Sequence, residues 1–232
     1  MNCIAHIETV YKTKFGVPRQ AGLVDVPSRI VFEPEYRVAE AVRGLEEFEY
    51  VWLIWGFHLA EREQWRPTVR PPRLGGNTRV GVFATRSPFR PNPIGLSSVR
   101  LLGVDVEQGL GPVLTVCGAD LVDGTPIYDI KPYIAYADSH PNARCGFAQD
   151  APMQLEVEDP GGMLEGLPLE MRSNLITTIS QDPRPHYQND PLRIYAMLFG
   201  EWEVRFRVDG ARAIIVAITA AGNPPSHAER ND

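Results

Sequence analysis

The chain has 232 residues, of which 44% are hydrophobic and 22% charged, and its formal net charge at pH 7 is −6. This composition is ordinary for a globular protein with one large domain or one domain with a small appendage. No apolar run approaches the length of a membrane-spanning helix, and the first residues lack the basic start and long apolar stretch of a signal peptide, so we expect a cytoplasmic protein with no membrane partner.

The amino-terminal half is predicted to be rich in strands. A first strand is expected at 4–10, and Pro34 can begin a short amphipathic helix that ends near Gly44. The run 50–59 is aromatic and β-branched and is typical of a strand buried on both faces. Further strands are predicted at 79–85, 97–106, 113–117 and 127–130. Short strands separated by Gly/Pro turns indicate a barrel or a sandwich.

The carboxy-terminal part has a different pattern. The segment 141–162 is rich in Pro, Gly and Asp and marks a domain boundary. After it, Pro168 can begin a helix that Asp182-Pro183 ends. Strands are predicted at 193–198, 202–208 and 213–218. We therefore expect a domain over 1–145 and a small α+β domain over 160–222.

Positive charge is concentrated in one window of this acidic chain. Residues 62–100 contain eight arginines and one acidic residue, Glu63, so the window carries +7 and the remainder −13. All of these cations are Arg and many lie beside prolines, which favours contact with phosphate or RNA over a merely solvated basic face. Arg70 and Arg73, which flank Pro71-Pro72, are the predicted phosphate contacts.

Metal chemistry is not expected. The three cysteines, Cys3, Cys117 and Cys145, are odd in number and widely spaced, which argues against both a disulfide framework and a zinc site. The five histidines show no metal-ligand spacing, which disfavours a metal-dependent hydrolase. We therefore predict no metal ligands.

Two loops have the composition of a binding site. The segment 81–97 contains three prolines that stiffen the backbone around Arg86, Arg90 and Asn92, whose side chains suit a carboxylate, a phosphate or a base edge. The segment 120–133 has an Asp-Gly turn followed by Asp129 and Lys131.

These loops and several further motifs resemble the TsaA-like, or TrmO, family. The other matching segments are Phe15-Gly-Val-Pro-Arg-Gln-Ala-Gly22, Ala41-Val-Arg-Gly-Leu45, Trp65-Arg-Pro-Thr-Val-Arg-Pro-Pro-Arg-Leu-Gly-Gly76 and Gln181-Asp-Pro-Arg-Pro185. The resemblance covers nearly the whole chain. It implies a β-barrel, in agreement with the strand pattern, and we therefore expect a mostly β protein with an amino-terminal β-barrel, a short helix and a small carboxy-terminal α+β domain. The α+β domain is expected to assist tRNA binding rather than chemistry, because the two loops both precede Pro141.

The resemblance also implies an activity. Members of the family are S-adenosylmethionine-dependent methyltransferases that modify N6 of threonylcarbamoyladenosine at position 37 of tRNA, beside the anticodon, and they form homodimers with the cofactor pocket near the subunit interface. The chain has no Gly-rich turn of the doubly wound type, so a methyl donor would occupy a different kind of site.

The family motifs imply specific contacts, carried over position by position. The cofactor-binding candidates are Pro18, Arg19, Gln20, His58, Leu59, Arg86, Asp120, Leu121, Val122, Asp123, Gly124 and Thr125. Leu59 stands where the family usually has glutamine, which weakens the prediction at His58 and Leu59. The candidates for substrate binding are Arg70, Arg73, Arg90, Asn92 and Lys131, with Arg90 and Asn92 assigned to the base and its carboxylate.

Methylation of an exocyclic adenine nitrogen requires loss of its proton, for which Asp129, Tyr128 and His58 are the catalytic candidates. Alternatives remain for each motif: His58 can be an ordinary core-edge histidine, Asp123 an ordinary turn residue, and Asp129 and Lys131 an ion pair on a strand. A non-catalytic RNA-binding barrel is the rival function.

Overall fold

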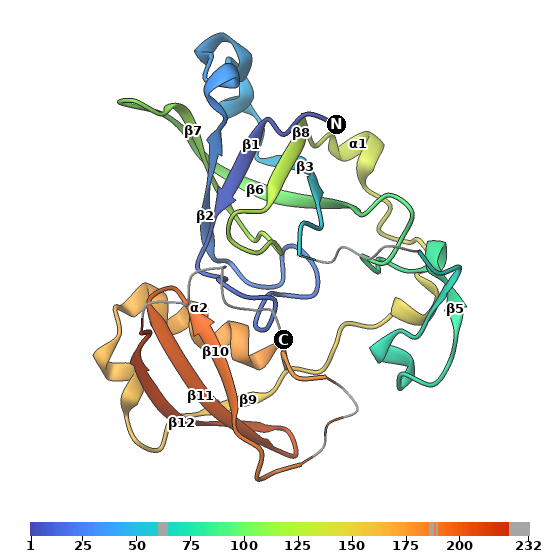
Figure 1. Cartoon of the computed structure of the whole chain (residues 1–232), viewed down its shortest axis with the longest axis vertical. Helices are drawn as coiled ribbons and strands as arrows, with labels where there is room; N and C mark the ends of the chain where they lie inside the picture. Colours follow the sequence, from blue (N-terminus) through green and yellow to red (C-terminus); the bar gives the residue numbers. More distant parts are fainter. Residues whose placement is uncertain (60–64, 186–187, 189, 223–232) are drawn as a thin grey trace, which may run out of the picture.

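A closed six-stranded barrel forms the amino-terminal part of the computed structural model, which describes residues 1–59, 65–185, 188 and 190–222. Its strands follow the order β1-β2-β7-β6-β3-β8, and every pair is antiparallel (Figure 1). The bounds are β1 Ala5–Glu8, β2 Pro27–Phe32, β3 Tyr50–Gly56, β6 Ile94–Glu107, β7 Gly111–Cys117 and β8 Pro126–Pro132. The predicted fold class, mostly β with an amino-terminal barrel, is confirmed.

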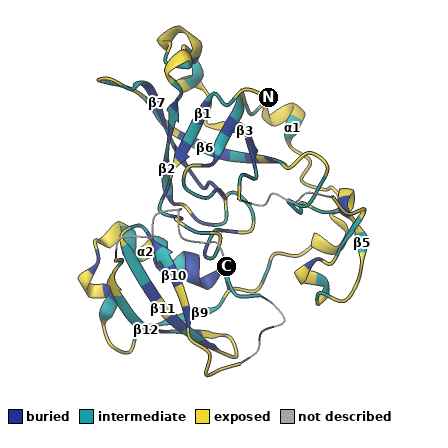
Figure 2. Ribbon diagram, in the orientation of Figure 1, coloured by how far each residue is buried: buried dark blue, intermediate teal, exposed yellow. Residues whose placement is uncertain are grey.

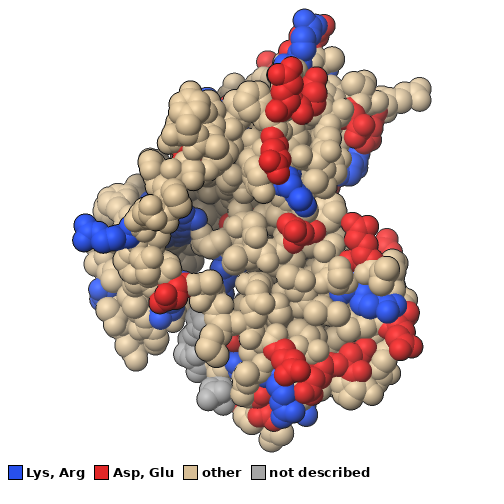
Figure 3. Space-filling model, turned by 180° about the vertical axis from the view of Figure 1, so that it is seen from behind, with Lys and Arg blue, Asp and Glu red and all other residues tan. Residues whose placement is uncertain are grey.

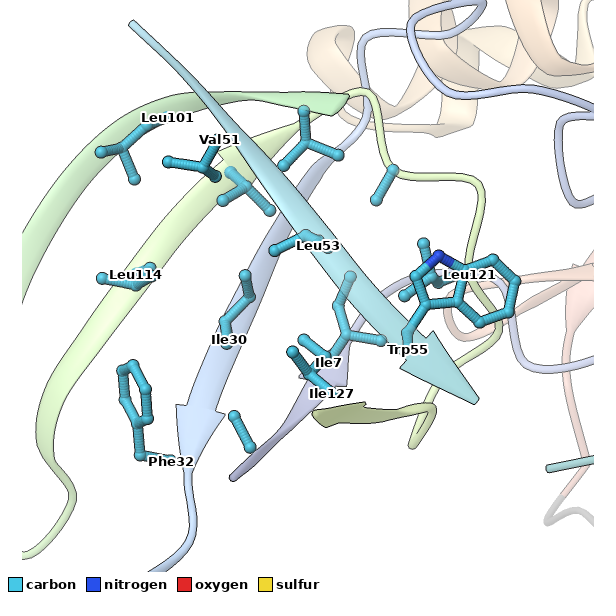
Figure 4. Packing of buried hydrophobic residues seen from close by; sticks show 14 of the residues in the cluster. Ile7, Ile30, Phe32, Val51, Leu53, Trp55, Leu101, Leu114, Leu121 and Ile127 are labelled. Carbon is cyan, nitrogen blue, oxygen red and sulfur yellow. The ribbon is translucent and has the colours of Figure 1, made fainter. Parts of the chain in front are cut away.

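The interior of the barrel is filled by alternate residues of its strands. On β3 the side chains of Val51, Leu53 and Trp55 are buried, whereas Trp52 and Ile54 are only half-buried. Figure 4 shows the inward side chains, with Trp55 at the end of β3 next to Leu121. The prediction that this strand is buried on both faces was wrong, because the outward face of a barrel strand meets only loops and solvent.

A second sheet packs below the barrel. It has the order β10-β11-β12-β9, with strands Tyr195–Phe199, Trp202–Asp209, Arg212–Ala220 and Glu156–Glu158 respectively. The predicted helix is found as α2, Leu169–Ser180. Strand β9 was not predicted, since three residues within a loop-like composition give no periodic signal. It lies parallel to β12 and before residue 160.

The two parts share a hydrophobic cluster. Tyr11, Val24 and Val26 precede β2, yet they are buried among residues of α2 and the second sheet. The hydroxyl groups of Tyr11 and Thr178 lie 3.3 Å apart, and the Gly200 amide donates a 2.8 Å hydrogen bond to the carbonyl of Val10. Figure 2 shows buried segments on both sides of this junction.

A lobe projects from the barrel between β3 and β6, and its residues 65–85 are called the arginine lobe below. It contains β4 (Thr68–Val69), β5 (Val80–Gly81), η4 (Pro72–Leu74) and η5 (Val82–Ala84). The prediction of a strand over 79–85 was therefore wrong beyond its first residues. Prolines and glycines leave this lobe little regular structure.

The predicted helix after Pro34 is also wrong. Three short 3₁₀ turns occupy this region: η1 Pro34–Tyr36, η2 Ala39–Val42 and η3 Leu45–Glu47. Val38, between the first and second turns, is extended with a φ of −111° and a ψ of 114°, so the backbone cannot continue helically within the predicted range. Arg43 is extended and Gly44 has a φ of +82°, which separates the second turn from the third.

The remaining short elements are α1 Ala135–Asp138, η6 Gly146–Ala148 and η7 Met163–Gly166. Among the described residues, no helix is long and apolar enough to cross a membrane.

Candidate active site

Three loops converge at the end of the barrel nearest the second sheet. The guanidinium of Arg86 donates a hydrogen bond to the side-chain carbonyl of Gln20, and its positive charge favours the ionised carboxylate of Asp120. These residues come from three distant segments that the family motifs had marked independently. Their approach brings an amide, a guanidinium and a carboxylate together.

A chain of two hydrogen bonds from barrel residues positions the Asp120 carboxylate. Ser97 Oγ, on β6, donates a 2.5 Å hydrogen bond to Asp120 Oδ1, and Trp55 Nε1, on β3, donates a 3.0 Å hydrogen bond to Ser97 Oγ. The Trp55 indole lies over Gly95, where a Cβ would be 2.2 Å from the ring. The chain Trp55–Ser97–Asp120 fixes the carboxylate on rigid strands rather than on a free loop.

Burial raises the pKa of the Asp120 carboxyl above its ordinary value. The hydrogen bond from Ser97, backbone N–H groups and the charge of Arg86 lower the pKa and partly offset this effect. The position of Asp120 in the barrel therefore makes its carboxyl easier to protonate than an exposed one.

Sequence reasoning did not select Ser97 or Trp55. Ser97 was read only as the beginning of a strand, and Trp55 as a core residue of another. Their contact depends on the register that pairs Trp55 with Gly95 and Leu53 with Ser97 across β3 and β6. The glycine opposite a tryptophan was the available signal, and it becomes informative only once the strands are paired.

Residues 121–125, in the second predicted loop, make contacts with other parts of the protein. Asp123 accepts a 2.9 Å hydrogen bond from the Thr9 amide and forms a 2.9 Å ion pair with Lys12. The Thr125 hydroxyl donates to the carbonyl of Val122 at 2.6 Å, and Leu121 is buried in the barrel core. Gly124 adopts a φ of +73° in the turn. These contacts match the alternative reading of Asp123, and cofactor contacts from its loop stay a prediction.

Arg19 points away from Gln20. Its guanidinium donates to the carbonyls of Asp182 and Arg184, at 2.9 and 3.0 Å, and burial lowers its pKa. Pro18, beside it, is buried. The structure thus divides the predicted Pro18-Arg19-Gln20 segment between the Asp120 cluster and the carboxy-terminal part.

Two catalytic candidates, Tyr128 and Asp129, lie on β8, and His58 lies two residues after the end of β3. Asp129 Oδ2 forms a 3.0 Å ion pair with Lys131, which is the alternative that the sequence left open. The Tyr128 hydroxyl packs against Gly56, where a Cβ would lie 2.3 Å from it. The backbone amide of His58 donates to the Gly56 carbonyl at 2.9 Å, and the carbonyl of Leu59 accepts from Lys14.

The predicted substrate residues fall in three segments: the loop that contains Arg90 and Asn92, the arginine lobe with Arg70 and Arg73, and β8 with Lys131. Arg90 donates to the Thr85 carbonyl of its own loop at 3.1 Å, and Asn92 is exposed. Arg70 is exposed in the arginine lobe, and Arg73 donates to the carbonyl of Asp150. Figure 3 shows this lobe, on the left of the view, with more blue than red, while most of the red atoms on the visible face lie on the rest of the molecule.

The arginine lobe also carries two exposed aromatic rings. Trp65 is 50% exposed and Phe83 72%, and their rings are stacked with centroids 6.3 Å apart. Within the described part of the chain, none of the lobe's arginines, Arg66, Arg70, Arg73 and Arg79, pairs with a carboxylate. Arg62 of the basic window lies outside the described residues. The lobe therefore offers charge and flat apolar surface together.

The cysteines are free, as expected. Cys3, His6 and Glu33 nevertheless lie close enough to hold a metal ion, with His6 Nε2 3.6 Å from Cys3 Sγ and His6 Nδ1 2.5 Å from Glu33. His6 Nδ1 also lies 3.9 Å from Cys3 Sγ, so this one nitrogen faces both partners. The absence of metal ligands stays a prediction.

Comparison with known proteins covers both parts of the chain. The model of the tRNA-methyltransferase O N-terminal domain matches residues 6–139, and that of the TrmO C-terminal domain matches 147–221. The chain is 43% identical to an Escherichia coli K12 protein named tRNA (adenine(37)-N6)-methyltransferase, over 93% of this chain and 95% of that protein. It is 47% identical to a protein of the same name from Eikenella corrodens, over 75% and 98% of the two chains.

Solved structures agree. A crystal structure of TrmO from Pseudomonas aeruginosa superposes with a TM-score of 0.75 and 30% identity, covering 94% of this chain and 97% of that one. The matches to both family models and the relatives of nearly full length lead to one conclusion: this chain belongs to the tRNA-methyltransferase O (TrmO) family.

Proposed function

We propose that the protein is an S-adenosylmethionine-dependent tRNA methyltransferase that modifies N6 of adenosine 37. Membership of the TrmO family supports the activity. The observation that carries the proposal is the convergence of Gln20, Arg86 and Asp120, three residues marked by separate family motifs. Arg86 donates a hydrogen bond to Gln20, and its charge acts on the Asp120 carboxyl.

The chemistry of this cluster fits S-adenosylmethionine. The cofactor carries a carboxylate, an ammonium, ribose hydroxyls and an adenine edge. Arg86 suits the carboxylate, Asp120 suits the ammonium or the hydroxyls, and Gln20 can donate and accept. When bound, the cofactor supplies an electrophilic methyl group. The residues of this chain contribute binding, orientation and acceptance of a proton.

The proton on N6 must pass to a protein group or to water as the new bond to carbon forms. Asp129, Tyr128 and His58 remain candidates, and the Asp129 carboxylate already forms an ion pair with the ammonium of Lys131. Asp120 joins these candidates, because burial raises its pKa and its Oδ1 is fixed by Ser97. Substitution of Asp120 is taken up in the Discussion.

The arginine lobe is the proposed contact for the tRNA backbone and loop. Arg70 and Arg73 supply phosphate contacts, and the exposed Trp65–Phe83 pair supplies a stacking surface for an unpaired base. The carboxy-terminal part, over about 160–222, is proposed to assist docking. Strand β9 would extend its beginning toward 156.

The finer substrate is threonylcarbamoyladenosine at position 37, as the family resemblance implies. Arg90 and Asn92, in the loop that contains Arg86, are the proposed contacts of the modified base. The test is mass spectrometry of tRNA nucleosides from cells with and without the protein. Loss of the N6-methylated form of threonylcarbamoyladenosine is expected, and an unchanged nucleoside profile would contradict the proposal.

The rival is a non-catalytic RNA-binding barrel. Titration of purified protein with S-adenosylmethionine in a calorimeter separates the two functions, since only the enzyme requires stoichiometric cofactor binding. A homodimer is also proposed, and light scattering at micromolar concentration tests it. The cytoplasmic location stays a prediction.

A further inference from the structure

A pocket lies where the barrel meets the carboxy-terminal part. Lys14 and residues 16–19 of the loop before Gln20 line one side, and Thr178, Gln181 and Pro183, at or just after the end of α2, line the other. Its volume is about 220 Å³. Sites that enclose a whole drug-sized ligand usually measure about 300–1,000 Å³, so this pocket suits one group of a larger substrate.

Three of the residues that line the pocket, Lys14, Arg19 and Gln181, carry N–H donors on their side chains. Gln181 is 8% exposed, and its Nε2 has no hydrogen-bond partner among the described residues. The Lys14 ammonium and the Arg19 guanidinium bring positive charge to the pocket, and the described contacts include hydrogen bonds from both to backbone carbonyls. None of the lining residues is acidic. An unpaired buried amide donor requires an acceptor, and the two cations favour an anionic one.

The backbone beside the pocket is strained. Asp182 has a φ of +49°, the one non-glycine residue with positive φ in the described part of the chain, and it precedes Pro183. Its carboxylate forms a 2.8 Å ion pair with Arg184 in which both side chains are largely buried. This conformation turns the carbonyls of Asp182 and Arg184 toward Arg19. Strain of this kind, held by specific contacts, is frequent at functional sites.

The end of α2 opposes an anion, because the carboxy-terminal end of a helix carries partial negative charge. The helix ends at Ser180, directly before Gln181. Lys14 and Arg19 are therefore needed to offset this charge. Their presence at the negative end of a helix is consistent with both structural stabilisation and ligand binding, and the unpaired Gln181 amide favours the second.

From these contacts we infer that the pocket binds an anionic oxygen of the substrate RNA, either the carboxylate of the modified base or a backbone phosphate. The inference rests on the proposed function and deepens it. Gln181 is the specific donor, and Lys14 and Arg19 supply the charge. The Gln181-Asp-Pro-Arg-Pro185 segment then contributes to substrate recognition. It lies beside the cluster of Gln20, Arg86 and Asp120, because Arg19 contacts the segment and the next residue, Gln20, contacts Arg86.

The test uses Gln181→Met, which keeps a long unbranched side chain but removes the donor, and Gln181→Glu, which places a negative charge there. Gln108→Met, in the exposed turn between β6 and β7, is the matched control. The full chain is assayed for binding to a tRNA that carries threonylcarbamoyladenosine at position 37, to the same tRNA with plain adenosine, and to S-adenosylmethionine.

Gln181→Met should weaken RNA binding by roughly 10- to 100-fold, as expected for loss of a hydrogen bond to a charged group, and Gln181→Glu should weaken it more. A loss confined to the modified tRNA assigns the pocket to the carboxylate. An equal loss on both RNAs assigns it to a phosphate. Cofactor affinity should not change in either case.

Unchanged binding of both RNAs by both variants overturns the inference, as does a loss confined to S-adenosylmethionine. These outcomes differ from failure of the proposed function, in which the unsubstituted protein itself binds no cofactor or does not methylate the modified tRNA. Far-ultraviolet circular dichroism and cofactor affinity show whether each variant is folded.

Discussion

A single buried hydroxyl, that of Ser97, connects the barrel core to the Asp120 carboxylate. Ser97→Ala removes the donor to Asp120 and leaves the buried Trp55 indole N–H without its acceptor. We expect a loss of about 1–3 kcal/mol in the free energy of unfolding, together with weaker cofactor binding. Urea unfolding and calorimetric titration measure the two effects.

Ser98→Ala is the matched control, because Ser98 is the next residue of β6 and faces outward. It should change neither stability nor cofactor affinity appreciably. If Ser97→Ala behaves like Ser98→Ala, the hydrogen-bonded chain does not position Asp120.

The ionised Asp120 carboxylate should lower the free energy of unfolding at neutral pH. Its pKa is raised in the folded protein, so the ionised carboxyl is less favourable there than in the unfolded chain. The stability associated with the protonated form is complete below the ordinary pKa of about 4 and is lost as pH rises through the folded-state pKa.

Asp120→Asn should therefore raise the melting temperature at pH 7, with a difference that shrinks toward pH 4, while methyl transfer is lost. Scanning calorimetry over this pH range, with the exposed Asp105→Asn as control, measures it. A difference that grows as pH falls would show that the carboxylate stabilises the fold instead.

The packing of strand β6 against β3 depends on the close approach of the Trp55 ring to Gly95. A Cβ at Gly95 would lie 2.2 Å from the Trp55 indole, which is itself buried in the barrel. Gly95→Ala should destabilise the protein by about 1–3 kcal/mol and displace Trp55 from Ser97. Tryptophan fluorescence and denaturant unfolding measure this, and Gly103→Ala on the same strand, where the nearest atom is 3.7 Å away, is the control. Equal effects at the two glycines would contradict the steric argument.

The arginine lobe should act through charge. Replacement of Arg70 and Arg73 by Ala should flatten the plot of log affinity for tRNA against log salt by roughly one to two units, since each phosphate contact on a single strand contributes a slope of about −0.7. Cofactor binding should not change. Arg43→Ala is the control, because Arg43 is exposed and lies 3.8 Å from Glu40 in another region. A slope equal to that of the unsubstituted protein would place the RNA elsewhere.

The elements show what sequence could and could not predict. The alternating strand β11 was predicted to within one residue, and β3 was predicted from its first residue but three residues too long. The helix after Pro34 failed because its apolar spacing suits a helix while the extended Val38 interrupts the backbone within it. Strand β9 failed because its pairing with β12 is set by the tertiary fold.

The same distinction holds in the candidate site. Gln20, Arg86 and Asp120 were selected from sequence motifs, because each of them belongs to a short continuous segment that can be recognised without the fold. Ser97 and Trp55 were not, because their roles depend on strand register and on a contact between strands distant in sequence. The direction of Arg19, toward Asp182, likewise requires the packed structure.

The whole molecule is held together by the cluster that its two parts share. Tyr11, Val24 and Val26 belong to the amino-terminal part but complete the core around α2 and the second sheet. Burial raises the pKa of the Tyr11 hydroxyl to about 12, and the hydrogen bond with Thr178 offsets only part of this effect. The amino-terminal part alone would expose these side chains to water.

We therefore expect one cooperative unfolding transition for the full chain, with a calorimetric enthalpy equal to the van't Hoff enthalpy. A chain limited to residues 1–145 should unfold at a lower temperature, because it loses the partners of Tyr11, Val24 and Val26 while retaining the barrel core. A chain that ends at residue 222 keeps both clusters and is the control for truncation. Two separate transitions in the full chain, one of them at the melting temperature of the 1–145 chain, would show that the parts fold independently and that the pocket between them is not held by a common core.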